Sequence, residues 1–173
     1  MIATITLNPS IDQHIYVEGF RKDDANRAQS IFRYPGGKGI NVSKVVRELG
    51  AKTHAYALVG GFPGELLKQL VRRLDIPFSP TPIRQDTRIN MIITDLGDHT
   101  QTRISAPGPR VPEQDVRHFL GQLLRVRPKP FLWALGGSLS AGMMLSTYRL
   151  FIAELQKKGV PCILDTDNEA LTL

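Results

Sequence analysis

The stretch that decides the fold is Tyr34-Pro35-Gly36-Gly37-Lys38-Gly39-Ile40-Asn41-Val42. Its three glycines let the backbone come close to a ligand, and a helix that begins at Lys38 directs unpaired main-chain N–H groups at that ligand. Lys38 adds a positive charge, and Asn41, one turn into the helix, can hydrogen-bond a hydroxyl group. These features suit a phosphorylated sugar or a nucleotide. The alternative is a plain tight turn before a glycine-rich helix start.

The spacing in this stretch excludes the two common nucleotide-binding loops. A Walker A loop has Ser or Thr after its lysine, whereas Gly39 follows Lys38, and Phe32 stands where the first glycine of that loop belongs. The dinucleotide fingerprint G-x-G-x-x-G also fails, because Val42 takes the place of its last glycine. The stretch therefore indicates a ligand-binding loop of another kind.

The segments on either side alternate between strands and helices. Buried strands are expected at residues 2–7, 54–59, 131–135 and 161–164, helices at about 38–49, 66–74, 116–124 and 144–155, and a turn at 60–64. This alternation is typical of an α/β fold with a mostly parallel sheet flanked by helices. Ligand sites in such folds lie at the carboxyl ends of the strands.

The middle of the chain interrupts this alternation. Two β-rich runs, at 88–94 and 100–104, are separated by a turn and predict a hairpin. We expect the hairpin to project from the main sheet together with short strands at 13–17 and 28–34. The whole of 1–173 is thus expected to form one α/β domain, with a small β lid drawn from about 12–34 and 88–105.

The composition favours an anionic small molecule as the partner. Lys and Arg total 22 against 16 Asp and Glu, a formal net charge of +6, but the basic residues are scattered, so nucleic acid is the less favoured partner. No apolar run is long enough to span a membrane, and no signal peptide is evident. The single cysteine, Cys162, rules out an internal disulfide. A cytoplasmic location is therefore expected.

Further binding candidates follow or open the predicted strands. Asn8 and Asp12 follow the first strand, where amide and carboxylate groups can hold sugar hydroxyls; an Asx turn is the alternative. Arg88 and Asn90 open the hairpin, and Arg suits bidentate phosphate contact unless it is a solvated edge-strand residue. Ser138 lies in a loop after a later strand, where a plain connecting loop is the alternative. The four histidines lack metal-ligand spacing, so no metal site is predicted.

Taken in order, segments along essentially the whole chain resemble the phosphofructokinase-B branch of the ribokinase-like sugar kinases. The matching stretches are Thr6-Leu7-Asn8-Pro9-Ser10-Ile11-Asp12, Pro35-Gly36-Gly37-Lys38-Gly39-Ile40-Asn41-Val42-Ser43, Leu49-Gly50-Ala51, Gly60-Gly61, Thr87-Arg88-Ile89-Asn90, Gly137-Ser138-Leu139 and Leu164-Asp165-Thr166. The first two are specific, and the later ones support one another by their order. The opening is most similar to 1-phosphofructokinases and tagatose-6-phosphate kinases.

The resemblance implies a Rossmann-like core with a β lid over the sugar, and a homodimer formed through that lid. The reaction would be ATP-dependent phosphorylation of a hexose phosphate (fructose-1-phosphate, fructose-6-phosphate or tagatose-6-phosphate) to a bisphosphate, with Mg²⁺ neutralising charge on the transferred group. Arg88 would lie near the substrate phosphate and Ser138 near the transfer site. By position, the substrate-binding residues would be Asn8, Asp12, Gly36, Gly37, Lys38, Asn41, Arg88, Asn90 and Ser138.

Three short stretches depart from the family pattern. Ser105-Ala106 stand where the family has Asn-Glu, Gly136 stands where it has the first serine of Ser-Gly-Ser, and Asp167-Asn168 replace Ser-Gly. Substrate contacts and loop geometry are expected to differ at these points.

The larger departure is length. Family members are longer, and their additional part carries an Asn-x-x-Glu motif, the nucleotide loops and a Gly-x-Gly-Asp segment whose aspartate is the general base. No Gly-x-Gly-Asp occurs here, so the catalytic aspartate is expected beyond Leu173. A truncated chain that binds a hexose phosphate with little turnover is the first hypothesis. The alternative is a non-catalytic sugar-phosphate-binding or dimerisation module from a split or decayed gene.

Overall fold

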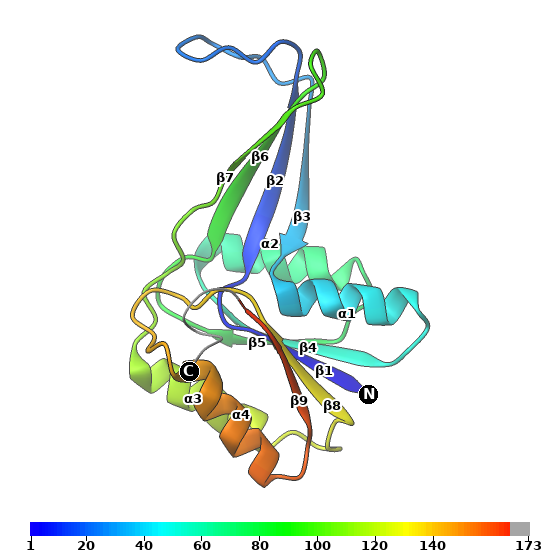
Figure 1. Ribbon diagram of the computed structural model, residues 1–173, viewed down its shortest axis with the longest axis vertical. Helices are drawn as coiled ribbons and strands as arrows, with labels where there is room; N and C mark the ends of the chain where they lie inside the picture. Colours follow the sequence, from blue (N-terminus) through cyan, green and yellow to red (C-terminus); the bar gives the residue numbers. More distant parts are fainter. Residues whose placement is uncertain (167–173) are drawn as a thin grey trace.

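The computed structural model describes residues 1–166, which form two β-sheets and four helices. Asp167 and Asn168, where the chain departs from the family pattern, lie outside the described residues. In Figure 1 one sheet forms the body of the molecule with its helices, and the other projects from that body as a long arm. Within residues 1–166, no helix is long and apolar enough to cross a membrane.

The sheet of the body is entirely parallel, with strand order β5-β4-β1-β8-β9. Its strands are β1 (Ile2–Thr6), β4 (Thr53–Val59), β5 (Phe78–Pro82), β8 (Leu132–Gly136) and β9 (Cys162–Asp165). Helices α1 (Lys38–Glu48) and α2 (Gly61–Arg72) pack on one face, and α3 (Glu113–Leu123) and α4 (Thr147–Lys157) pack on the other. The predicted α/β fold with a mostly parallel sheet is confirmed.

Alternation along β1 separates the two faces of this sheet. Ala3 and Ile5 join the apolar core beneath α3 and α4. Thr4 and Thr6 point the other way: Thr4 Oγ1 shares a 2.7 Å hydrogen bond with Ser43 Oγ, and Thr6 Oγ1 accepts the main-chain N–H of Ile40 at 3.1 Å. Polar side chains on the central strand thus anchor α1, and they fix its N-terminus over the carboxyl end of β1.

The arm is a four-stranded sheet with order β3-β2-β6-β7. Its strands are β2 (Ser10–Val17), β3 (Ser30–Gly36), β6 (Arg88–Asp95) and β7 (Gln101–Ile104). β2 pairs antiparallel with β3 and parallel with β6, and β7 closes a hairpin with β6. This four-stranded arm is called the second sheet below. Its strands come from residues 10–36 and 88–104.

The structure differs from the sequence prediction in three local features. β2 begins at Ser10 instead of Gln13, so Asp12 lies within a paired strand. Residues 60–64, predicted as a turn, include the first turn of α2, because Gly64 lets that helix begin in close contact with Val59. The edge strand β5 was not predicted, since its prolines argue against a strand.

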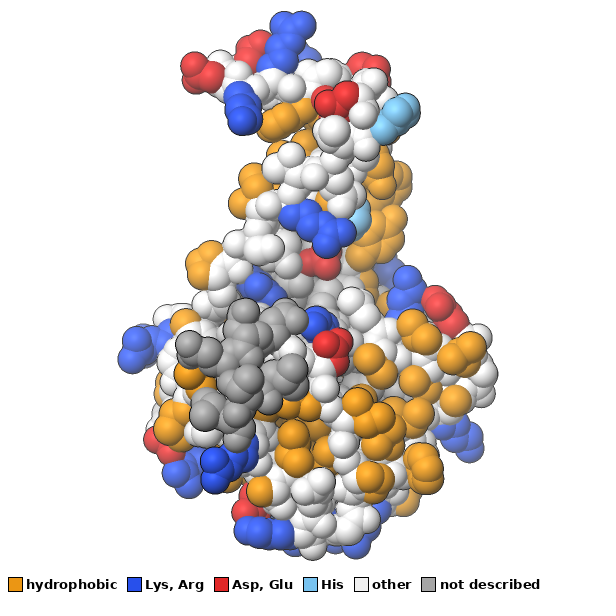
Figure 2. Space-filling model, viewed as in Figure 1, with side chains coloured by type: hydrophobic (Ala, Val, Ile, Leu, Met, Phe, Trp, Pro, Cys, Tyr) orange, Lys and Arg blue, Asp and Glu red, His pale blue; other side chains and the backbone are white. Residues whose placement is uncertain are grey.

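Hydrophobic side chains are not all inside. Figure 2 shows them gathered over the lower right of the body, beside α1 and the sheet edge that ends at β9.

Candidate functional site

A cleft of about 300 Å³ opens between α1 and one face of the second sheet. Its lining combines side chains of both charges with amides and one hydroxyl: Asp12, His14, Asn41, Asn90, Met91, Ile92, Arg103 and Ser105. The cleft lies where the chain passes from β1 into β2, at the carboxyl end of a central strand of the main sheet. This is the edge at which α/β folds bind ligands.

Asp12 is the centre of the polar network in the cleft. Asn90, its partner in the β2–β6 register, donates from Nδ2 to Asp12 Oδ1 at 2.8 Å, and Ser10 Oγ donates to the same oxygen at 2.8 Å. The main-chain N–H of Ala106 donates to Asn90 Oδ1 at 3.1 Å, which fixes the orientation of that amide. Both hydrogen bonds to Asp12 end on Oδ1, so Oδ2 can accept from a ligand hydroxyl.

The glycines of the deciding stretch allow this close packing. A Cβ at position 36 would lie 2.6 Å from Asp12 Oδ2, so only glycine leaves room for the carboxylate. Gly37 caps the N-terminus of α1 with φ 118°, a backbone conformation that favours glycine. A Cβ at position 39 would lie 2.6 Å from the carbonyl oxygen of Ile5. The run therefore seats α1 directly on β1 and beside Asp12.

Lys38 links the start of α1 to the end of β9. Its Nζ lies 2.9 Å from Asp165 Oδ1, and both side chains are partly exposed. An ion pair of this kind adds little to stability. Its effect is to hold a positive charge at the helix N-terminus, next to Gly136, whose absent Cβ would lie 3.0 Å from Lys38 Cβ. Asn41, one turn further along α1, is exposed and lines the cleft.

Arg88 and Asn8 lie deeper and hold loops together. Arg88 donates from Nη1 to the carbonyl of Ala106 at 3.3 Å and from Nη2 to the carbonyl of Asn8 at 3.2 Å. The side chain of Asn8, only 5% exposed, donates to Ser138 Oγ at 3.1 Å and to the carbonyl of Leu139 at 3.3 Å. The loops after β1, β7 and β8 are thereby joined at one point.

Two polar atoms in this region have no partner within residues 1–166, Asn8 Oδ1 and Arg88 Nε. Burial lowers the pKa of Arg88, and the nearby charge of Asp12 opposes that shift. The guanidinium group remains charged, because arginine does not lose its proton in proteins. A fixed positive charge therefore stands behind the Asp12–Asn90 pair.

The predicted site residues form two connected groups. Asp12, Asn41 and Asn90 line the cleft itself, and Gly36, Gly37 and Lys38 form the loop and helix start beside it. Asn8, Arg88 and Ser138 are linked by hydrogen bonds immediately behind it. Ser138 is exposed.

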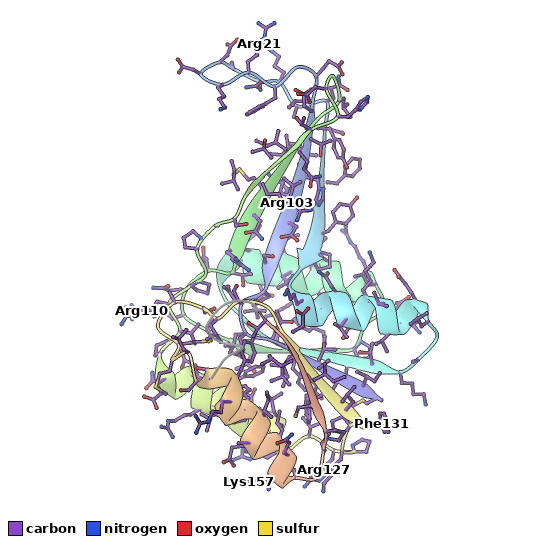
Figure 3. The ribbon with its side chains drawn as sticks, in the orientation of Figure 1. Arg21, Arg103, Arg110, Arg127, Phe131 and Lys157 are labelled. Carbon is purple, nitrogen blue, oxygen red and sulfur yellow. The ribbon has the colours of Figure 1, made fainter. Side chains whose placement is uncertain are left out.

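Sequence reasoning missed five residues that line the cleft: the polar residues His14, Arg103 and Ser105 and the apolar residues Met91 and Ile92. Arg103, labelled in Figure 3, pairs with Ile92 in the β6–β7 register, and its Nε donates to Gln101 Oε1 at 3.1 Å. The available signal was the period-2 alternation of β7, which places Gln101 and Arg103 on one face.

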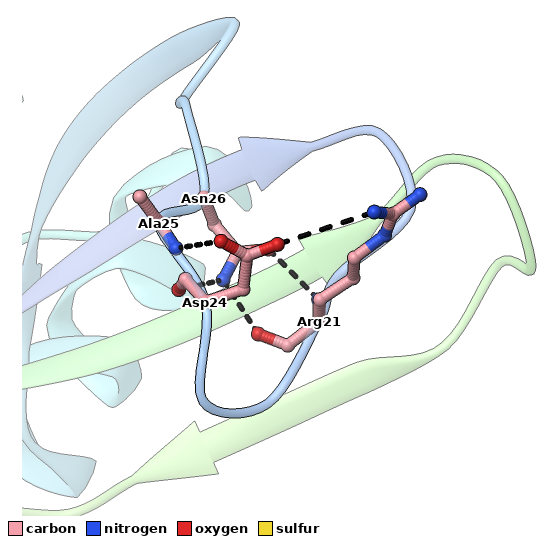
Figure 4. A network of polar contacts seen from close by, with 4 residues as sticks. All are labelled: Arg21, Asp24, Ala25 and Asn26. Carbon is pink, nitrogen blue, oxygen red and sulfur yellow. Dashed lines mark hydrogen bonds and ion pairs between the residues drawn. The ribbon is translucent and has the colours of Figure 1, made fainter.

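The far end of the second sheet carries its own turn structure. The main-chain N–H of Arg21 donates to Asn26 Oδ1 at 2.8 Å, and Asp24 Oδ1 accepts the N–H of Ala25 at 2.7 Å (Figure 4). In the neighbouring β6–β7 turn, Asp98 Oδ1 accepts from the main chain and the hydroxyl of Thr100. Asp98 thus has a local structural role in the turn.

The model of the pfkB family of carbohydrate kinases matches residues 5–173. This chain belongs to the pfkB family. Its two most specific motifs, which end at Asp12 and begin before Gly36, meet beside the cleft described above.

Relatives of this pfkB chain include phosphofructokinases. The 1-phosphofructokinase of Bacillus subtilis strain 168 is 34% identical over 171 residues, which are 99% of this chain and 55% of that protein. Phosphofructokinase-2 from Escherichia coli, solved in complex with fructose-6-phosphate, superposes with a TM-score of 0.93 at 30% identity over 99% of this chain and 56% of that chain. A possible 1-phosphofructokinase from Thermotoga maritima gives a TM-score of 0.91 at 30% identity, covering 99% and 55% respectively. The chain thus spans about half the length of these relatives.

Proposed function

We propose that this chain supplies the sugar-phosphate site of an ATP-dependent hexose-phosphate kinase. The substrate would be fructose-1-phosphate, fructose-6-phosphate or tagatose-6-phosphate, and the product a bisphosphate. The Asp12–Asn90 pair carries the proposal, because it fixes a carboxylate and an amide side by side at 2.8 Å in a cleft that also contains Arg103. A carboxylate and an amide can hydrogen-bond to sugar hydroxyls, and a guanidinium group can bind phosphate.

The proposed roles follow from position in the cleft. Asp12 Oδ2, Asn41 and Asn90 bind sugar hydroxyls, while Arg103 and His14 face the substrate phosphate. Lys38 and the main-chain N–H groups at the start of α1 stabilise negative charge at the transfer side. Gly36 and Gly37 allow the sugar ring and Asp12 to approach the backbone.

Asn8, Arg88 and Ser138 have a different proposed role from direct recognition of the sugar. Their hydrogen bonds connect three loops, so they position the cleft. Ser138, which is exposed, remains the member of this group proposed to reach the transferred phosphoryl group.

The relatives support the substrate class. One is named 1-phosphofructokinase, and another was solved with fructose-6-phosphate. Because the chain spans about half of each relative, the activity of a whole kinase is part of the proposal. A cytoplasmic location is proposed with it.

ATP and Mg²⁺ belong to the proposal as the family's phosphoryl donor and metal. Within residues 1–166, no group of three or more His, Cys, Asp or Glu side chains could hold a metal ion. The proposed contribution of the described residues is to bind and orient the sugar phosphate and to neutralise its negative charge.

A second candidate function is a sugar-phosphate-binding or dimerisation module that performs no phosphoryl transfer. The carboxylate–amide pair of Asp12 and Asn90 would serve binding equally well in such a module. A coupled phosphoryl-transfer assay with ATP and each of the three hexose phosphates separates the two functions: turnover by this chain alone contradicts the module, and binding without turnover supports it.

The second sheet is proposed as a homodimer surface. Its face opposite Asp12 exposes Ile31, Ile89, Met91 and Ile104, which share that face by strand register. E. coli phosphofructokinase-2 has been solved in a tetrameric inhibited form, so oligomers occur in the family. Light scattering on the wild type and on Ile104→Glu tests this surface, since a monomeric wild type contradicts the dimer.

The binding proposal is tested by calorimetric titration with fructose-1-phosphate, fructose-6-phosphate and tagatose-6-phosphate. We expect one of the three to bind, and Asp12→Ala to weaken that binding by roughly 100-fold while leaving it measurable. Asp98→Ala is the matched control, because that carboxylate sits in the β6–β7 turn. Equal binding by wild type and Asp12→Ala would contradict the assignment of the cleft as the sugar-phosphate site.

A further inference from the structure

A second pocket lies at the opposite end of the main sheet from the cleft. Its volume is about 550 Å³, which is within the range of small-molecule sites. The end of α1, the chain just before β1, the start of β4 and the loop from α2 into β5 surround it (Figure 1). Because the strands are parallel, this end carries their amino termini, so the pocket is called the amino-end pocket below. It shares no lining residue with the cleft.

Two cations line the amino-end pocket, Arg47 in the last turn of α1 and Lys52 just before β4. Within residues 1–166, neither side chain forms an ion pair or a hydrogen bond. Arg47 is not needed to cap α1, because the main-chain N–H groups of Gly50 and Ala51 donate to the carbonyls of Arg47 and Val46, each at 3.0 Å. Two positive charges therefore border the pocket without a partner in the described part of the chain.

One carboxylate lines the same pocket. Asp75 lies in the loop between α2 and β5 with φ 53°, in the left-handed region that residues other than glycine seldom adopt. Its side chain is exposed and has no hydrogen-bond or ion-pair partner among residues 1–166. The two cations outnumber this carboxylate, so the pocket favours an anion, and Asp75 can accept a hydrogen bond from a hydroxyl group of the same ligand.

His54, at the start of β4, completes the polar lining. Its Nε2 shares a 2.8 Å hydrogen bond with Ser79 Oγ, and its ring stacks on Tyr56 with the ring centroids 4.5 Å apart. Burial lowers the pKa of His54, so the imidazole adds no charge to the pocket at neutral pH. An anion bound beside the ring would favour its protonated form and raise that pKa.

Buried hydroxyl groups hold the walls of the amino-end pocket together. Thr53, which also lines it, shares a 2.9 Å hydrogen bond with Ser43 on α1, and Ser43 shares one of 2.7 Å with Thr4 on β1. All three side chains are buried. α1 is therefore tied to the start of β4 before any ligand binds, and a preformed site binds without the cost of ordering its walls.

We propose that the amino-end pocket binds a small phosphate monoester that also carries hydroxyl groups. The guanidinium group of Arg47 can hold two phosphate oxygens, and Lys52 supplies the second positive charge that a dianion needs. Asp75 accepts a hydrogen bond from a hydroxyl group of the ligand. An uncharged polyol would leave both cations without a partner, and a bare anion would gain nothing from Asp75. The inference rests on this pocket alone and not on the proposed sugar-phosphate binding in the cleft.

The test is titration of the isotope-labelled chain with glycerol 3-phosphate, inorganic phosphate and glycerol, followed by NMR spectroscopy. We expect the main-chain amides of Lys52, Thr53 and His54 to shift with glycerol 3-phosphate, to shift less with inorganic phosphate at equal concentration, and not to shift with glycerol. The pKa of His54, measured from its ring resonances, should rise when glycerol 3-phosphate is bound. The melting temperature should rise by roughly 5–10 °C at a concentration about 100-fold above the Kd.

Substitutions identify the groups that bind. Arg47→Gln and Lys52→Gln should each weaken the binding of glycerol 3-phosphate by roughly tenfold. Arg149→Gln is the matched control, because Arg149 is an exposed arginine on α4, away from the pocket. Asp75→Gly suits the left-handed backbone at that position and should reduce the preference for glycerol 3-phosphate over inorganic phosphate. Melting temperatures without ligand show whether each variant is folded.

Three results overturn the proposal. One is the absence of amide shifts at residues 52–54 with glycerol 3-phosphate. Another is equal affinity for that ligand in folded Arg47→Gln and Arg149→Gln. The third is a set of shifts confined to Asp12 and Asn41 and lost in Arg103→Gln, which would place the ligand in the cleft. A chain that binds glycerol 3-phosphate in the amino-end pocket but binds no hexose phosphate refutes the proposed function alone.

Discussion

Replacing Gly36 with alanine tests whether the glycine run exists to make room for Asp12. The added Cβ would lie 2.6 Å from Asp12 Oδ2 and closer still to Ser10 Oγ, whereas ordinary van der Waals contact begins at 3.4 Å. The Ser10 hydroxyl must therefore shift, and the carboxylate must move by about 0.8 Å. Gly36 lies on β3 and Asn90 on β6, on opposite sides of β2. The carboxylate is therefore confined between them and must rotate, which breaks at least one bond at Oδ1.

The expected cost follows from those contacts. A hydrogen bond to a charged group is worth about 1.5–3 kcal/mol, which corresponds to roughly 10- to 100-fold in affinity for the sugar phosphate. Overpacking lowers the free energy of unfolding by about 1–3 kcal/mol. Calorimetric titration measures the first effect, and urea unfolding measures the second.

The refuting results are specific. Gly121→Ala is the control, because nothing lies within 4 Å of a Cβ at that position in α3, and its affinity for the sugar phosphate should match that of the wild type. In an Asp12→Ala background, Gly36→Ala should change unfolding but leave residual sugar-phosphate affinity unaltered. Two results would contradict the idea that Gly36 makes room for Asp12. One is wild-type affinity for the sugar phosphate in the single Gly36→Ala variant. The other is a loss of affinity in the double variant as large as the sum of the two single losses.

Other changes probe the second sheet and the loops behind the cleft. Main-chain N–H groups of Phe20 and Gly97 hold the pKa of Asp95 below its usual value. The stabilising contribution of the Asp95 carboxylate is therefore present above about pH 3.9 and is lost as the pH falls through the folded pKa. Thermal melts should show that the melting temperature of Asp95→Asn falls less steeply at acid pH than that of the wild type. Arg103→Gln should weaken phosphate-ester binding roughly tenfold and reduce its salt dependence, as measured by titration at two ionic strengths. Asn8→Ala should lower the free energy of unfolding by about 1–3 kcal/mol in urea, because it leaves loop groups unpaired; an unchanged urea midpoint contradicts that role.

The main sheet was predictable because its strands and helices are long and strongly periodic. The apolar face of α3 and the buried run of β4 are local signals that survive in the folded protein. β5 escaped prediction because its prolines oppose a strand, yet an edge strand can leave those positions unpaired. The start of α2 was not predicted, because glycines that indicate a turn also allow a helix to begin against a neighbouring strand.

The site was only partly predictable for a related reason. Asp12, Asn90 and Asn41 stand in segments whose local pattern already indicated a ligand. Arg103 and His14 enter the cleft through strand register, a long-range property: alternation along β7 groups Arg103 with Gln101 but does not show which face of the sheet borders the cleft. Asn8 and Arg88 were predicted to contact the substrate, whereas in the structure their side chains hydrogen-bond to loop atoms, and such partners cannot be read from a motif.

Register explains how motifs more than twenty residues apart form one site. Residues 18–29 carry the chain to the far tip of the second sheet and back, and the return strand then places Gly36 opposite Ser10 and Tyr34 opposite Asp12. The length of that excursion is free to vary, because loop closure costs little per added residue. The register is not free: a slip of one residue would turn Asp12 to the outer face of the sheet and bring a different residue beside Asn90. Asp95 therefore has a role beyond its own turn, since its bonds to Gly19 and Phe20 fix the chain at the end of β2 and hold the register that forms the cleft.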